Sequence, residues 1–173
     1  MTRVAAETIE TARLVLVPLR IEHAEPMAIV LADPQLHVFT GGAPETAPQL
    51  RSRYARMLAG PSDPGVSWCN WVIRLRENHQ LTGTVQATVS PDADDGLYVE
   101  VAWVIGTAWQ RRGIATEAAR ALVDWLARQP IHAVIAHIHP DHRASAAVAT
   151  AVGLTPTAEV HDGEIRWHKD VDR

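Results

Sequence analysis

Residues Gln110 to Ala115 have the types and spacing expected of a loop that binds a phosphate group. Gly113 lets the backbone approach a ligand closely, and Ala115 adds only one methyl group beside it. The sequence pattern starts a helix at Gly113, and the first turn of a helix offers unpaired N–H groups and the positive end of the helix dipole. Arg111 and Arg112 place further positive charge there. These residues therefore predict an anion-binding loop.

A simpler interpretation of the same loop is that Gly113 only starts a helix and that both arginines are solvated, because short glycine patterns are common. The loop has neither the Gly-Lys-Ser/Thr of a P-loop nor the G-x-G-x-x-G of a dinucleotide-binding turn. The surrounding elements must therefore distinguish the two interpretations.

The loop lies between a predicted strand and a predicted helix. Leu97 to Ile105 is the most apolar of the strand patterns, and Gly113 to Arg128 carries an apolar stripe at helical spacing. Two further strand patterns, Trp68 to Leu75 and Leu81 to Val89, come before Leu97 and are separated by short turns. This order favours an antiparallel meander that leads into the loop.

The rest of the chain alternates between helix and strand patterns. Before the meander we expect a strand at Thr11 to Leu19 and helices at Glu22 to Ala32 and Gln49 to Ala59. After the loop we expect a strand, a helix and a closing hairpin, at Ala133 to Ile138, Ala144 to Val152, and Thr157 to Val160 with Ile165 to Lys169. This mixture predicts an α+β fold.

Length and composition favour one domain over residues 1–173. The formal net charge of -4 does not suit a duplex nucleic-acid binder. No stretch approaches the roughly 20 apolar residues of a membrane span, and residues 1–10 do not resemble a secretory signal. Cys69 is the single cysteine, so an intrachain disulfide is excluded and a cytoplasmic location is expected.

The pattern Gln110-x-x-Gly113-x-Ala115 resembles the pyrophosphate-binding motif Q/R-x-x-G-x-G/A of the GCN5-related N-acetyltransferases (GNAT superfamily). The stretch from Glu100 to Ala118 is similar to the branch that contains the ribosomal-protein acetyltransferases RimJ and RimL. Thr11 to Leu16 and the pattern Ser145…Val148…Gly153-Leu154 also resemble that branch, so the resemblance extends from Thr11 to about Lys169.

The resemblance implies a twisted mixed sheet of about six to seven strands flanked by about four helices. Its fourth and fifth strands, here Leu97 to Ile105 and Ala133 to Ile138, would splay around acetyl-CoA, which acts as co-substrate without a metal. The implied contacts are the backbone of Trp103, Val104 and Ile105 for the pantetheine, and Gln110, Arg111, Arg112, Gly113, Ile114, Ala115 and Thr116 for the pyrophosphate.

The resemblance also implies direct acetyl transfer to a primary amine. Glu100, in an otherwise apolar strand, is the expected general base, although it could instead lie on a solvated sheet face. Ser145 is the expected acid for the leaving thiolate, or else a helix-start residue. His142 stands where relatives often have an asparagine that contacts the cofactor, and relatives often place a tyrosine on the last helix, where this chain has none.

The resemblance places the acceptor among Phe39, Trp68 and Trp71, with Tyr54 a weaker choice; the tryptophans could equally be core residues. The acceptor is a protein N-terminal amine, a small amine or an aminoglycoside-type antibiotic. An antibiotic cleft would be acidic, which directs attention to the loop residues Glu45, Asp92, Asp94 and Asp95. We expect a monomer or homodimer, with neither nucleic acid nor membrane as partner.

Two further alternatives follow from the sequence. The chain could be a non-catalytic acetyl-CoA-binding module, since it lacks the tyrosine and the asparagine. The cluster of His132, His137, His139 and His142 near Asp141 could bind a metal ion, but no cysteine accompanies it and histidines at this spacing are a weak signal.

Overall fold

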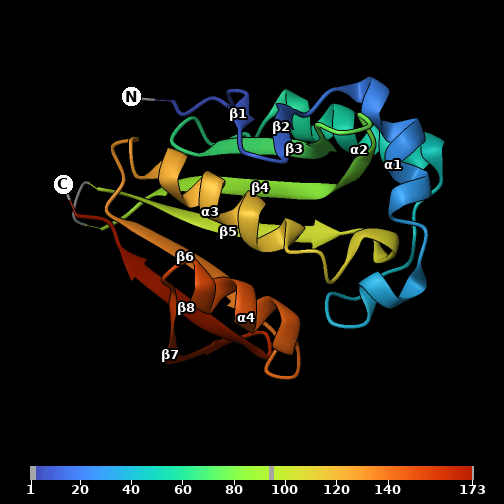
Figure 1. Cartoon of the computed structure of the whole chain (residues 1–173). Coiled ribbons are helices and arrows are strands. Elements are labelled where there is room, and N and C mark those ends of the chain that lie inside the picture. Colours follow the sequence, from blue (N-terminus) through green and yellow to red (C-terminus); the bar gives the residue numbers. More distant parts are fainter. Residues whose placement is uncertain (1–2, 94–95, 173) are drawn as a thin grey trace.

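The computed structural model describes residues 3–93 and 96–172, and within these residues eight strands form one sheet in the order β1-β2-β3-β4-β5-β6-β8-β7 (Figure 1). The strands are β1 (Ile9–Glu10), β2 (Leu14–Pro18), β3 (Ser67–Leu75), β4 (Leu81–Pro91), β5 (Leu97–Ile105), β6 (Ala133–Ile138), β7 (Thr155–His161) and β8 (Glu164–Asp170). The α-helices are α1 (Ala24–Val30), α2 (Ala47–Ala59), α3 (Ile114–Leu126) and α4 (Arg143–Ala151). The expected mixed α+β fold is confirmed.

Helices α3 and α4 pack on one face of the sheet and form the larger core with it (Figure 1). Leu122 of α3 is fully buried there, as is Trp71 of β3. The Trp71 ring meets Trp125 edge to face, with centroids 5.4 Å apart, an arrangement that aromatic pairs prefer. The amphipathic stripe that predicted α3 is therefore the face that it buries.

Helices α1 and α2 pack together on the opposite face of the sheet. Met27 of α1 and Leu50 of α2 are buried against Val72, the residue after Trp71 on β3. Neighbouring residues of a strand point to opposite faces, so β3 supplies both cores at once. Among the described residues, no helix is both long enough and apolar enough to cross a membrane.

Strands β5 and β6 are parallel but pair at three positions, the last of which is Glu100 with Ile135. Beyond it β5 stays paired with β4 as far as Ile105, and β6 stays paired with β8 as far as Ile138. The two strands therefore diverge after Glu100, as Figure 1 shows, and the expected splay is confirmed. One edge of residues 101–105 faces the resulting opening.

Most elements differ from their predicted ranges by a few residues at the ends, and three differences are informative. Strand β1, two residues long, adds an eighth strand that is too short for alternation to reveal. Helix α2 begins at Ala47 rather than Gln49, because Thr46 and Gln49 form a capping box and Pro48 is tolerated in a first turn. Pro34–His37 forms a 3-10 helix that was not predicted.

Candidate functional site

The predicted anion-binding loop connects β5 to α3. Arg111 and Gly113 have positive φ angles of 63° and 76°, and Gly113 is the N-cap of α3 without a side chain to cap it. The N–H groups of the first helical turn therefore have no capping side chain at Gly113, which leaves them for an anion. Gln110 donates from Nε2 to the Ile105 carbonyl at 3.0 Å and so holds the loop against the end of β5.

A second set of contacts holds the first turn of α3. Glu117 accepts hydrogen bonds from the Thr11 hydroxyl at 2.6 Å and from Arg13 Nε at 2.7 Å, and Arg13 Nη1 donates to the Arg112 carbonyl at 2.9 Å. Burial alone would raise the pKa of Glu117, but the hydrogen bonds from Thr11 and Arg13 outweigh it and lower that pKa. Glu117 is therefore a charged clamp between the loop and the β1–β2 turn.

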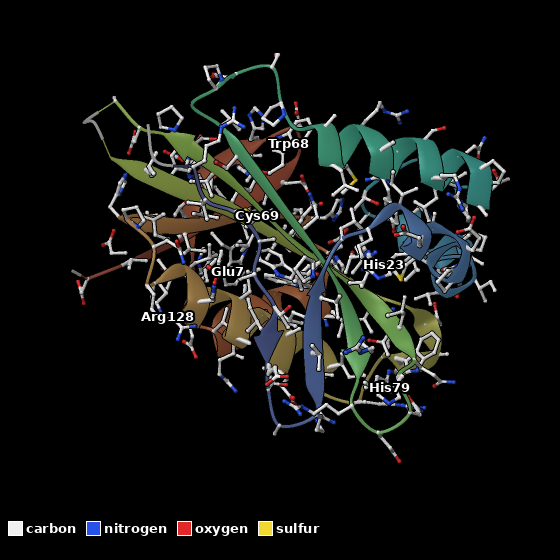
Figure 2. The ribbon with its side chains drawn as sticks, turned by 90° about the horizontal axis from the view of Figure 1, so that it is seen from above. Glu7, His23, Trp68, Cys69, His79 and Arg128 are labelled. Carbon is white, nitrogen blue, oxygen red and sulfur yellow. The ribbon has the colours of Figure 1, made fainter. Side chains whose placement is uncertain are left out.

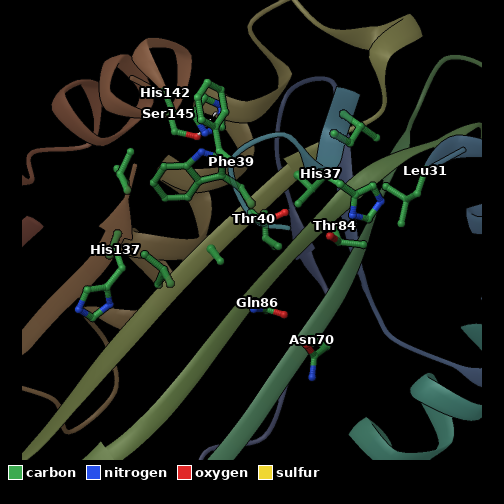
Figure 3. Close-up of a pocket in the computed structure, with 18 of the residues that line it drawn as sticks. Leu31, His37, Phe39, Thr40, Asn70, Thr84, Gln86, His137, His142 and Ser145 are labelled. Carbon is green, nitrogen blue, oxygen red and sulfur yellow. Dashed lines mark hydrogen bonds between the residues drawn. The ribbon is translucent and has the colours of Figure 1, made fainter. Parts of the chain in front are cut away.

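A cavity of about 390 Å³ lies where β5 and β6 diverge (Figure 3). One wall comes from α2 and the segment between α1 and α2, another from the middle of β3, β4 and β5, and a third from β6 and the start of α4. The residues with polar side chains in these walls include His37, Thr40, Arg53, Asn70, Thr84, Gln86, His137, His139, His142, Ser145 and Glu164. Trp103 and Val104, on the open edge of β5, border the same space.

Glu100 lies on β5 at the last position paired with β6, and its carboxylate contacts Nδ1 of His137 on β6. His137 lines the cavity and its side chain is 18% exposed, whereas the Glu100 side chain is 44% exposed. Glu100 is thus half-exposed rather than enclosed by apolar residues, because it lies on the opposite sheet face from the buried Val99 and Val101. The sequence did not predict its imidazole partner.

His142 and Ser145 meet at the start of α4, on the far side of the cavity (Figure 3). Ser145 Oγ lies 3.3 Å from His142 Nε2, within hydrogen-bond distance. The His142 ring stacks on Phe39 with centroids 4.6 Å apart and an interplanar angle of 16°. Burial, and to a lesser extent the nearby His139, lowers the pKa of His142, which favours the neutral form of its imidazole.

The four aromatic residues considered for the acceptor lie in different places. Phe39 lines the cavity beside His142. Trp68 lies at the start of β3, near the loop that follows α2, and is 42% exposed (Figure 2). Trp71 borders the cavity but has no exposed surface, and its Nε1 donates to the Glu7 carbonyl at 2.8 Å. Tyr54 lines the cavity, and burial raises its pKa to about 12.

Several cavity residues were not found by sequence reasoning. His37 and Thr40 come from the unpredicted 3-10 helix and the loop after it, and Asn70 and Gln86 come from the middle of β3 and β4. A signal was present in β4, where polar residues at alternate positions, such as Gln86 between Thr84 and Thr88, mark a strand face that is not fully buried.

The acidic residues considered for an antibiotic cleft are not gathered in the cavity. Among the described residues that line it, Glu164 is the one carboxylate. Asp92 instead lies 2.9 Å from His132, and Glu45 lies 3.7 Å from Arg53. Asp94 and Asp95 lie outside the described residues. Within the described ranges, no three His, Cys, Asp or Glu side chains come together as metal ligands.

A family model described as an acetyltransferase (GNAT) domain matches residues 13–155 of the chain. A comparison with curated proteins finds no match. Solved structures give many matches, of which an acetyltransferase from Agrobacterium tumefaciens is 26% identical, with a TM-score of 0.73 and 94% of each chain covered.

Two further solved structures show the same fold at lower identity. One is RimL, a ribosomal L7/L12 α-N-protein acetyltransferase in complex with coenzyme A, which is 16% identical with a TM-score of 0.78, covering 96% of this chain and 99% of RimL. The other is an aminoglycoside acetyltransferase in complex with coenzyme A, 17% identical with a TM-score of 0.74, covering 91% of this chain and 94% of the other.

Proposed function

Because the chain belongs to the GNAT acetyltransferase family, we propose that it is an acetyl-CoA-dependent N-acetyltransferase that transfers the acetyl group directly to a primary amine. One observation supports this proposal most strongly. Where β5 and β6 part, there is a cavity lined by ionisable side chains. The open edge of β5 connects this cavity to the uncapped start of α3.

The residues that border the opening fit acetyl-CoA. The pantetheine would pair with the backbone of Trp103, Val104 and Ile105 at the free edge of β5. The pyrophosphate would accept hydrogen bonds from the N–H groups of residues 111–116, where the helix dipole also favours negative charge. His142, next to Ser145, would offer a hydrogen bond to the pantetheine arm in place of the family's asparagine.

Two positions flank the space where the thioester would lie. Glu100, together with the His137 imidazole that its carboxylate contacts, would remove a proton from the amine. Ser145 would give a proton to the sulfur that leaves. The two residues come from β5 and α4, and the side chains nearest each of them, His137 and His142, line the cavity together with Ser145. An amine that enters the cavity would therefore meet the thioester between them.

The cavity favours an acceptor with a single amine on a largely apolar body. Leu31, just after α1, and apolar side chains of α2 such as Leu50 and Met57 form the wall away from the opening, and Phe39 lies at the edge of that opening. A polycationic antibiotic would need several carboxylates, whereas Glu164 is the one found among the described lining residues. A peptide N-terminus or a small monoamine therefore suits the cavity better than an aminoglycoside.

An acceptor screen tests the proposal. The purified protein is incubated with acetyl-CoA and with peptides that have free N-termini, small monoamines, polyamines, amino acids and aminoglycosides, and the released thiol is measured. We expect release with at least one peptide or monoamine, and an acetylated amine as product. Tight acetyl-CoA binding without release on any amine would contradict the proposal and favour the non-catalytic module.

A further inference from the structure

We propose that His137, rather than Glu100, is the side chain that takes the proton from the acceptor amine, and that Glu100 is a positioning residue that holds the imidazole. This inference rests on the proposed function, because it assigns one step of amine acetylation to a further residue. Relative position supports it first: His137 lines the cavity that the amine would enter, whereas Glu100 is not among the lining residues.

The strand geometry explains why the two side chains meet. Glu100 is opposite Ile135 in the last parallel pair of β5 and β6, and His137 lies two residues further along β6. Residues two apart in a strand point to the same face, so His137 shares the face of Ile135 and leans back toward Glu100. Beyond this point β5 has moved away from β6, and His137 lies on the β6 side of the opening, with Gln86 and Asn70 on the far side of β5 (Figure 3).

The contact sets the tautomer of the imidazole. A carboxylate accepts hydrogen bonds, so Nδ1–H of His137 donates to Oε1 of Glu100. The lone pair of a neutral ring is then on Nε2, which is the arrangement of a general base held by a carboxylate. Because Nδ1–H is donated to Glu100, Nε2 of the His137 imidazole is the atom left to accept a proton from the cavity.

Other charged groups surround His137 on several elements. Arg166 is opposite it on β8 and pairs with Glu159 of β7 at 3.4 Å. The His161 ring of β7 lies with its centroid 5.7 Å from that of His137, and Glu164 lines the same cavity. Within this set, Glu100 is the carboxylate that contacts the His137 ring.

The acetyl transfer moves two protons away from the acceptor nitrogen. The amine enters as an ammonium ion and gives one proton to Nε2 of His137. The nitrogen lone pair forms the C–N bond with the thioester carbon, the C–S bond breaks, and its electron pair leaves with the sulfur. As the amide forms, the nitrogen loses a second proton to solvent, while Ser145 gives its hydroxyl proton to the departing sulfur and regains one from solvent. The proton on His137 then passes to solvent.

The test uses His137→Asn, whose amide keeps a donor for Glu100 but cannot accept the proton, and His137→Gln as a second variant. We expect either to lower kcat by at least about 10²-fold, with acetyl-CoA affinity and melting temperature unchanged. In a plot of kcat/KM against pH, the fall in activity on the acidic side should disappear in both variants. In Glu100→Gln this fall should remain, because the imidazole that accepts the proton is still present.

A matched control is His132→Gln, which removes the imidazole of the Asp92–His132 pair, a carboxylate–imidazole contact of 2.9 Å whose residues do not line the cavity. Its activity should match the wild type. The double variant of Glu100→Gln and His137→Asn should be no slower than His137→Asn alone, because both act on one proton transfer.

The outcomes separate the two proposals. If the wild type acetylates an amine and the folded His137 variants keep a kcat within a few-fold of the wild-type value, the role of His137 is overturned. The proposed function would then stay intact. A wild type that acetylates no amine would overturn both. Additive losses in the double variant would also contradict a shared step.

Discussion

The donor side and the acceptor side of this site are built in different ways. The donor side, which would hold acetyl-CoA, is nearly one continuous piece of chain: the open edge of β5, the loop at Gln110 to Gly113 and the first turn of α3. The acceptor side is a cavity whose walls come from α2, the segment between α1 and α2, the strands β3 to β6 and the start of α4, which lie far apart in the sequence.

The two sides would therefore recognise their ligands through different parts of the chain, backbone on the donor side and side chains on the acceptor side. A phosphate is recognised by backbone N–H groups, which any sequence has, so the donor side needs only a permissive residue such as Gly113 and a clamp such as Glu117. The acceptor side would recognise the apolar part of the acceptor and its amine through side chains. It follows that changes on the donor side should alter acetyl-CoA affinity, and changes at Glu100 or in the cavity should alter turnover.

The largest expected effect is at Glu100. Glu100→Gln should lower kcat by about 10²-fold or more with little loss of acetyl-CoA affinity, because the His137 imidazole loses the carboxylate that holds it for proton removal. Steady-state thiol release and calorimetric titration with acetyl-CoA measure the two quantities separately. Unchanged turnover would remove Glu100 from the reaction.

Gly113→Val should weaken acetyl-CoA binding by about tenfold or more. A β-branched residue at a φ of 76° is strained by roughly 1–2 kcal/mol, and its side chain would stand beside the first-turn N–H groups. Gly163→Val is the matched control, since Gly163 has a φ of 80° with no atom within 4 Å of an added Cβ, and lies in the β7–β8 turn. Equal affinity in both variants would contradict the phosphate role of the loop.

Ser145→Ala should lower kcat by about tenfold, a smaller loss than at Glu100 because a thiolate is a good leaving group even without a proton donor. Ser145→Thr keeps a hydroxyl and should retain most of the activity. Thiol release at saturating acetyl-CoA is the measurement. If Ala and Thr variants are equally slow, the residue serves to pack or cap α4 and not to move a proton.

The smallest effect concerns the clamp. Glu117→Gln should lower the free energy of unfolding by about 1–2 kcal/mol at neutral pH, through weaker hydrogen bonds from Thr11 and Arg13. Because the pKa of Glu117 is lowered by folding, its contribution is present above about pH 4.5 and is lost as the pH falls through its lower folded value. Urea unfolding at several pH values tests this.

The control for the clamp is Glu22→Gln, which removes one charge from the exposed pair of Arg20 and Glu22, whose side chains are both 70% exposed. Exposed pairs contribute little to stability. A loss as large as that of Glu117→Gln would show that the clamp has no special role in holding the loop.

The sequence predicted the donor side better than the acceptor side for a physical reason. The motif at Gln110 to Ala115 and the stripe of α3 are local patterns, as are the meander and the β7–β8 turn, where Asp162 and Gly163 both have positive φ as a tight hairpin requires. The contacts of Glu100 with His137 and of Phe39 with His142 join residues about 40 to 100 positions apart. No local pattern encodes such contacts.

The most direct test of this account is a crystal structure of the protein with coenzyme A. The account predicts the pantetheine between β5 and β6, paired with the backbone of residues 103–105, the pyrophosphate over the N–H groups of residues 111–116, and the thiol close to Ser145 at the edge of the cavity. Coenzyme A bound elsewhere, or with its thiol directed away from the cavity, would contradict it.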